Sequence, residues 1–333
     1  MHTSRLLIAL GTLAISGWAQ PSAGVAGPVT GFIFDAQSGA VRPMLGIPGA
    51  AYLGNGVAIG LDAASVAPDG SAALAVHRGG KLVLYTGLRS AHPADLAVAG
   101  AIPSPDRFAW APDGSAAAVY SPHAAQGQML TGFGQSPVAA APFDLSSLPG
   151  QVTALAFDGQ QLIVAVASPD AGGIYLASAS SGIQRIAPAI SPSAIALAGS
   201  SLFFADSQSQ QIFQVQDYAG TPGAAVFAND GGINSPAGLQ VSADGQRLFV
   251  ANAGNRKLAV YDIPSRAPIE SLDLPFTPTR LDRFGDSSVF LLNASGQGPL
   301  YVVRDGGPGK AAAVYFVPSP AHRRPLRPPI RPT

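Results

Sequence analysis

The chain has 333 residues, of which 47% are hydrophobic and only 11% are charged, and its 19 basic and 19 acidic residues give a formal net charge of zero. This length and apolar content allow one large folded body with a buried core. The absence of cysteine excludes disulfides, thiolate metal ligands and a lipoprotein attachment site. No basic stripe alternates with exposed aromatic residues, so nucleic-acid binding has no support.

Residues 1–19 have the pattern of a secretory signal peptide. Arg5 precedes an apolar run from Leu6 to Ile15, and the small residues Gly17 and Ala19 occupy the two positions that a signal peptidase reads, which predicts cleavage before Gln20. The run is shorter than the roughly 20 apolar residues that cross a bilayer. We therefore expect a secreted or periplasmic protein with no transmembrane segment in the mature chain.

Residues 20–317 are predicted to form a single all-β domain built from a repeated unit. In the clearest copy, Ser235 to Asp262, an Ala-Asp-Gly turn and an Asn-Ala-Gly-Asn turn separate three short apolar runs, as in a strand, a tight hairpin, a strand, a loop and a strand. A similar turn glycine recurs every 40 to 46 residues, at Gly70, Gly114, Gly159, Gly199, Gly245 and Gly285. This period is typical of the blades of a β-propeller.

The start and the end of the domain decide the number of blades. Gly31 to Asp35 and Ala40 to Leu45 resemble the latter half of a blade, joined by a turn at Ala36 to Gly39. We expect circular closure, in which this N-terminal hairpin and the run Ala311 to Val317 together complete the last blade. Seven blades are favoured, and six, the number of turn glycines, is the alternative.

Several segments resemble known propeller repeats. Leu248 to Asp262 is similar to the repeat of the YVTN and NHL families, and Ser201 to Val215 is similar to an NHL repeat. Ala67 to Val76 and Ala111 to Val119 resemble the Pro-Asp-Gly turn of WD40-like and YVTN repeats. The resemblance implies an exported, bacterial-type propeller and no particular reaction, because these folds host many functions.

Polar residues recur where the second strand of each unit is expected to end, at the mouth of a central channel. They are His77, Ser121, Asp206, Asn252 and Asn293. One interpretation is that they simply begin loops, where Asn, Asp and Ser are favoured. The other is that they bind a polar ligand, with Asp206, Asn252 and Asn293 as ligands for Ca²⁺ or another divalent cation.

Two further features bear on binding. Arg256, in the loop after the second strand of the clearest unit, is a candidate contact for an anionic partner. Residues 318–333 contain six prolines, four arginines and no acidic residue, which predicts an extended, disordered tail.

The function expected from these features is that of an exported scaffold. Its loops would bind an envelope or extracellular protein or polymer, with no catalytic activity and no obligatory cofactor. The alternative is a metal-dependent lactonase, another hydrolase or a lyase that acts at the mouth of the channel. Propeller lactonases that resemble this architecture use an acidic, Asn-rich ring around a divalent metal, whereas Asp206 is the one charged member of the set here.

Overall fold

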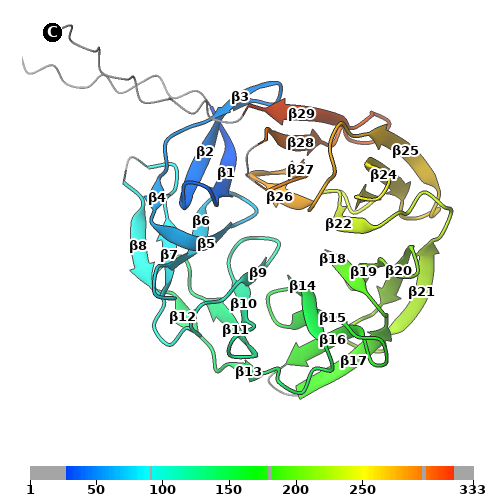
Figure 1. The fold of residues 1–333 in the computed structure, drawn as a ribbon, viewed down its shortest axis with the longest axis horizontal. Helices are drawn as coiled ribbons and strands as arrows, with labels where there is room; N and C mark the ends of the chain where they lie inside the picture. Colours follow the sequence, from blue (N-terminus) through cyan, green and yellow to red (C-terminus); the bar gives the residue numbers. More distant parts are fainter. Residues whose placement is uncertain (1–27, 91, 179–181, 295–297, 319–333) are drawn as a thin grey trace, which may run out of the picture.

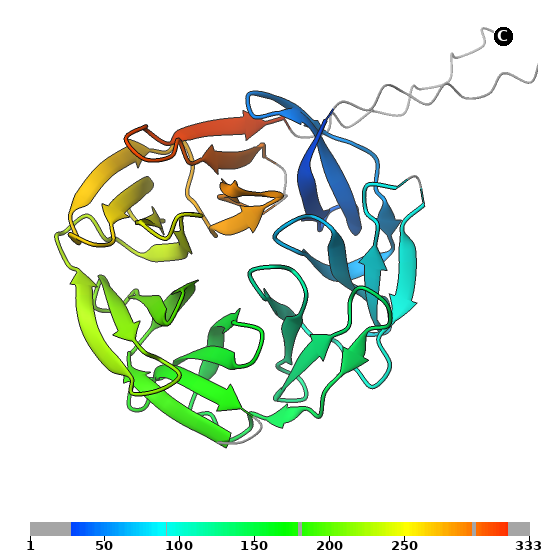
Figure 2. The same cartoon turned by 180° about the vertical axis from the view of Figure 1, so that it is seen from behind.

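The structure, a computed structural model, describes residues 28–90, 92–178, 182–294 and 298–318, and in these ranges it is an all-β ring of seven sheets (Figure 1). The seven-bladed β-propeller predicted from the repeats is confirmed. The view from behind shows the same ring of separate blades around a central axis (Figure 2). The predicted signal peptide, residues 1–19, and the predicted tail, apart from Pro318, lie outside the described residues.

Each blade is formed by consecutive strands. Blade 1 contains β1 (Val29–Asp35), β2 (Ala40–Ile47), β3 (Ala50–Leu53) and β4 (Ala58–Ile59); blade 2 contains β5 (Leu61–Val66), β6 (Ala72–His77), β7 (Leu82–Thr86) and β8 (Ala94–Ala97). Blade 3 contains β9 (Arg107–Trp110), β10 (Ala117–Ser121), β11 (Gln126–Thr131), β12 (Val138–Ala139) and β13 (Phe143–Asp144); blade 4 contains β14 (Gln151–Phe157), β15 (Leu162–Ala167), β16 (Gly173–Ser178) and β17 (Gly182–Pro188).

The remaining three blades repeat the simple four-stranded order. Blade 5 contains β18 (Pro192–Ala198), β19 (Ser201–Asp206), β20 (Gln211–Gln216) and β21 (Gly223–Ala228); blade 6 contains β22 (Pro236–Val241), β23 (Arg247–Asn252), β24 (Lys257–Asp262) and β25 (Pro268–Asp273); blade 7 contains β26 (Asp282–Phe284), β27 (Asp286–Leu291), β28 (Leu300–Arg304) and β29 (Ala313–Val317). Within the described sheets neighbouring strands pair antiparallel, for example with Leu248 opposite Tyr261 in blade 6.

The turn glycines lie between the first and second strands of blades 2 to 7. All six have positive φ, from 58° at Gly199 to 101° at Gly159, which glycine adopts without the steric cost of a side chain. Neighbouring aspartates organise the same turns. The Oδ1 of Asp69, for example, accepts a hydrogen bond of 2.9 Å from the backbone N–H of Ser71, and Asp113 bonds Ser115 in the same way.

The core lies between adjacent blades. The second strands are buried on both faces, as in β15, where every residue from Leu162 to Val166 is fully buried. This explains their continuous apolar sequence, since a strand with one wet face would alternate. Between blades 5 and 6, for example, Phe203 and Ile212 pack with Leu239 and Leu248 in one cluster.

The ring closes differently from the sequence-based expectation. Gly39, with φ +57°, occupies the first turn of blade 1, so β1 is an innermost strand and β2, β3 and β4 complete its sheet. At the other end β29 pairs with β28, with Leu300 opposite Val317. The expected mixed blade of the N-terminal hairpin and the terminal run is therefore wrong. The hairpin closes the ring by packing against blade 7, through an apolar cluster that includes Ile33, Phe284 and Val317.

Candidate functional site

The six predicted site residues lie on one face of the ring, with Arg256 in the loop that leaves β23. His77, Ser121, Asp206 and Asn252 end β6, β10, β19 and β23, and Asn293 follows β27 by two residues. Second strands end, and first strands begin, on this same face, because Pro192 pairs with Asp206 and Pro236 with Asn252. We call this surface the loop face; over blades 5 and 6 it consists of the loops 189–191, 207–210, 229–235 and 253–256.

Asp206 is a buried carboxylate that ties two loops together. It is 3% exposed. Its Oδ2 accepts a hydrogen bond from the N–H of Ile190 at 3.0 Å, and its Oδ1 accepts hydrogen bonds from the N–H groups of Ser191 at 3.3 Å and Gln208 at 2.8 Å. A buried charge needs such donors. The loop that enters β18 is therefore fixed to the loop that leaves β19.

Asn252 and Asn293 also form hydrogen bonds with backbone groups, in blades 6 and 7. The Oδ1 of Asn252 accepts a hydrogen bond of 2.9 Å from the N–H of Asn234, in the loop that enters β22. The Oδ1 of Asn293 accepts one of 2.8 Å from the N–H of Tyr301, and its Nδ2 donates to the carbonyl oxygen of Pro299 at 3.0 Å. In the described residues each of these three side chains accepts hydrogen bonds from the backbone of a neighbouring segment.

The remaining predicted residues make fewer contacts. The Nε2 of His77 lies 2.9 Å from the hydroxyl oxygen of Tyr85, and Ser121 is fully buried, with no hydrogen-bond partner for its Oγ among the described residues. Arg256 is exposed in the loop after β23, with φ +54°. Among the residues that the structure describes, no group of three or more His, Asp or Glu side chains is arranged to hold a metal ion.

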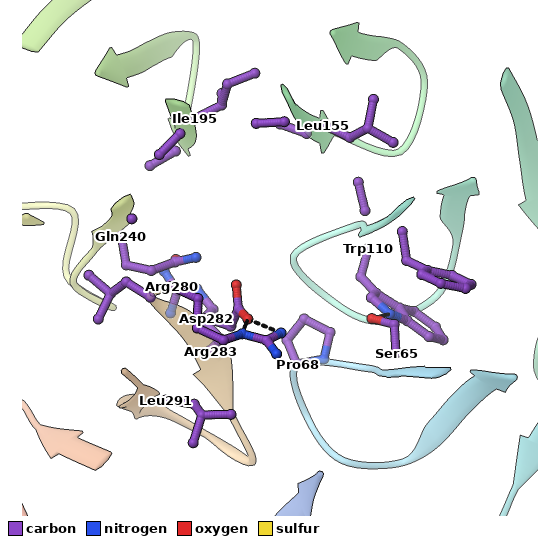
Figure 3. A pocket seen from close by; sticks show the side chains of 18 of the residues that line it. Ser65, Pro68, Trp110, Leu155, Ile195, Gln240, Arg280, Asp282, Arg283 and Leu291 are labelled. Atoms are coloured by element: carbon purple, nitrogen blue, oxygen red, sulfur yellow. Dashed lines mark hydrogen bonds and ion pairs between the residues drawn. The ribbon is translucent and has the colours of Figure 1, made fainter. Parts of the chain in front are cut away.

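A central cavity of about 400 Å³ lies among the first strands of all seven blades (Figure 3). Much of its wall is apolar, with Leu155 from blade 4, Ile195 from blade 5 and Trp110 from blade 3. Arg280, Asp282 and Arg283 lie on the opposite side, next to Gln240 of blade 6, as Figure 3 shows. The cavity thus has an apolar side and a charged side.

The charged side belongs to blade 7. The Nε and Nη2 atoms of Arg280 both contact Oδ2 of Asp282. The Nη2 of Arg283 donates a hydrogen bond of 2.7 Å to the carbonyl oxygen of Val241, and its guanidinium carbon lies 5.8 Å from the centre of the Phe290 ring. Burial lowers the pKa of Arg283, but an arginine remains protonated at neutral pH.

Hydrogen bonds between neighbouring first strands hold the wall of the cavity. The Nε1 of Trp110 donates to Oγ of Ser65 at 3.0 Å, across blades 3 and 2. The hydroxyls of Thr153 and Ser193 each donate, at 2.6 Å, to the carbonyl oxygen of the proline that begins the first strand of the next blade. These contacts fix the separation of adjacent strands, so the cavity is largely preformed.

The sequence interpretation did not find the cavity residues, because it looked for polar groups at the ends of second strands. A signal was nevertheless present. The segment Arg280-Leu281-Asp282-Arg283 ends two residues before the marker Gly285, so it lies at the first strand of its unit, which lines the channel. Three charged residues in such a short inner segment stand out from the apolar first strands of blades 4 and 5.

Comparison with known proteins gives the fold and no family. No family model and no curated protein sequence matches the chain. A functionally unknown protein from Desulfotomaculum acetoxidans DSM 771 superposes with a TM-score of 0.61 at 13% identity, over 87% of this chain and 99% of that one. A putative lactonase, named as a 6-phosphogluconolactonase, from Bacteroides fragilis NCTC 9343 gives 0.58 at 10% identity, over 87% and 94%. The β-propeller domain of Cps50 (Swd1) from Myceliophteria thermophila gives 0.52 at 13% identity, over 80% and 93%.

At these identities the similarity extends to the propeller fold alone. The resemblance of the repeats to the YVTN, NHL and WD40-like families is therefore supported at the level of the propeller architecture. Within the described ranges, no helix has the length and apolar character needed to cross a bilayer.

Proposed function

We propose that the protein is an exported scaffold whose loop face binds an envelope or extracellular protein or polymer. The observation that carries this proposal is the anchoring of the loops by buried side chains, above all Asp206 and Asn252. Loops that stand on a rigid framework can bind a partner without a large ordering cost. A propeller offers seven such sets of loops on one disc.

The loops of blades 5 and 6 form the best supported part of this surface. Oε1 of Gln210 accepts a hydrogen bond of 2.7 Å from the N–H of Ser235, which joins the loops of the two blades. Ile190 is 51% exposed although its N–H is fixed by Asp206, and Arg256 is exposed on the adjacent blade. Fixed, exposed apolar side chains and exposed guanidinium groups are typical contacts in protein interfaces.

The alternative function is metal-dependent hydrolysis of a lactone or ester, or a lyase reaction, at the mouth of the channel. It would require Asp206, Asn252 and Asn293 to bind Ca²⁺ or another divalent cation, and their oxygens to exchange backbone N–H donors for the metal. The putative lactonase among the structural neighbours shares the fold at 10% identity, and it supports this alternative only through that fold.

Interaction through the loop face can be tested with matched variants. The full chain, its Ile190→Ser/Arg256→Ser variant and a control, Gln160→Ser/Gln246→Ser, are immobilised and cross-linked to envelope extracts. The control residues are exposed and lie in turns on the opposite face. We expect a partner captured by the wild type and the control, and at least about tenfold less capture by the loop variant, since interface energy is concentrated in a few contacts.

The same samples separate the two functions and test export. Equal capture by both variants would contradict the scaffold proposal. A Ca²⁺-dependent hydrolysis of lactones that is lost in Asp206→Asn would favour the enzyme instead. Fractionation of expressing cells should recover the chain outside the cytoplasm, beginning at Gln20, if residues 1–19 direct its export.

A further inference from the structure

We propose that the central cavity binds a small organic anion with an apolar body, such as an aryl or alkyl carboxylate. The carboxylate would lie against the arginines of blade 7, and the apolar body would contact the wall formed by Leu155 and Ile195. None of the residues of this site belongs to the loops of blades 5 and 6 discussed above. Most of them come from first strands, and Arg280 lies just before β26, where the chain enters that strand.

The charge of the cavity favours an anion. Arg280, Asp282 and Arg283 are the charged residues among those that line it, so the lining carries one net positive charge. Arg280 engages one oxygen of Asp282 through Nε and Nη2, and a guanidinium has five N–H donors in total. Guanidinium groups match the geometry of a carboxylate.

The opposite wall favours an apolar body on that anion. Leu155 and Ile195 are half-buried residues whose side chains face the cavity (Figure 3), and both belong to strands whose alternate residues pack between blades. A ligand that covers them removes apolar surface from water. A simple inorganic ion would leave the side chains of Leu155 and Ile195 in contact with water.

The dimensions and rigidity of the cavity fit a small molecule. A volume of about 400 Å³ is within the range of sites that enclose small organic ligands. Gln240 supplies an amide beside the charged residues, and the bond from Trp110 to Ser65 fixes the wall on the far side. A preformed site of this kind needs little ordering when the ligand enters.

The test is calorimetric titration of the full chain with three probes. Cinnamate has an anionic group and an apolar body, cinnamyl alcohol has the same body without the charge, and acetate has the charge without the body. We expect cinnamate to bind at least about tenfold more tightly than either of the others, and its affinity to fall as salt is added. Equal binding of cinnamate and the alcohol, or no binding of cinnamate, would overturn the proposal.

Three variants locate the site. Arg280→Gln removes a positive charge from the cavity, so it should raise the Kd of cinnamate about tenfold and leave the Kd of the alcohol unchanged. Asp282→Asn removes a negative charge, so it should lower the Kd of cinnamate several-fold. Arg304→Gln, an exposed change on β28 outside the cavity, is the matched control and should have no effect. If Arg280→Gln and Arg304→Gln give the same Kd, or Asp282→Asn weakens binding, the anion does not bind in this cavity.

Discussion

The ion pair between Arg247 and Asp305 fastens blade 6 to blade 7, and its removal should destabilise the ring measurably. Arg247 begins β23 and Asp305 directly follows β28. The contacts are bidentate, with Nη1 2.6 Å from Oδ1 and Nη2 2.8 Å from Oδ2, and the two side chains are only 9% and 5% exposed. Asp305→Ala would leave the guanidinium buried, with the carbonyl oxygen of Gly307 at 2.9 Å and the more distant Oδ2 of Asp244 at 3.8 Å as its remaining partners.

The expected size of this effect follows from the burial of the pair. Breaking a buried ion pair by removing one partner costs about 3–5 kcal/mol. An unfolding entropy of about 2.1 cal/mol/K per residue, over the roughly 290 residues of the ring, gives about 0.6 kcal/mol/K and a fall in Tm of about 5–8 °C. Differential scanning calorimetry measures this fall directly.

An exposed ion pair provides the control. Lys257 and Asp273 lie 3.2 Å apart in blade 6, but their side chains are 43% and 88% exposed. Asp273→Ala should cost less than about 1 kcal/mol and lower Tm by less than about 2 °C. The double variant Arg247→Met/Asp305→Leu should recover most of the lost stability, since no buried charge is left unpaired. A fall in Tm for Asp305→Ala no larger than that for Asp273→Ala would refute the reasoning.

Three further predictions concern alkaline pH, the seam of the ring and the loop face. Burial and a neighbouring carboxylate raise the pKa of Tyr218 and of Tyr261. The unfolded chain therefore loses these protons first, and the free energy of unfolding should fall as pH rises above about 10. In chemical denaturation Tyr218→Phe/Tyr261→Phe should make this fall with pH smaller, and an unchanged pH dependence would contradict the prediction. Gly285 has φ +68°, and a Cβ there would lie 2.1 Å from the carbonyl oxygen of Thr30. Gly285→Ala should therefore lower Tm several degrees more than Gly245→Ala, where φ is +71° and the space around the Cβ is open. Equal falls in Tm would show that the seam tolerates the methyl group. Asp206→Ala should cost about 2–4 kcal/mol in urea unfolding because several backbone N–H groups lose the buried carboxylate that accepts their hydrogen bonds. Asp62→Ala, at an exposed position, should cost little.

The sequence was sufficient for the architecture because the blade period is imposed by local chemistry. Each turn needs a residue that tolerates positive φ, and glycine marks it in blades 2 to 7. Blade 1 was misread because its turn glycine, Gly39, stands only 31 residues before Gly70, and no Asp-Gly pair marks it. Its hairpin therefore resembled the outer half of a blade, although β1 is an inner strand.

The candidate site was harder to predict, because position in a repeat does not reveal what a side chain contacts. The pattern correctly placed His77, Asp206 and Asn252 at the ends of second strands. It did not show that the oxygens of Asp206 and Asn252 accept hydrogen bonds from the loop that enters the same blade. That loop precedes each residue by more than ten positions, and the two meet only when the first two strands of the blade pair. The cavity depends on first strands from all seven blades, so it exists only after the ring has closed.

The closure of the ring also has a consequence during synthesis. Each sheet is complete as soon as its own stretch of chain has emerged, since every blade uses consecutive strands. The seam is different, because Ile33 and Met44 on one side must wait for Phe284 and Val317 on the other. Until then the nascent protein is an open arc with an uncovered apolar surface at each end, and such surfaces favour aggregation. The final step of folding therefore joins segments about 270 residues apart, and a chaperone that shields blade 1 would act where protection is needed longest.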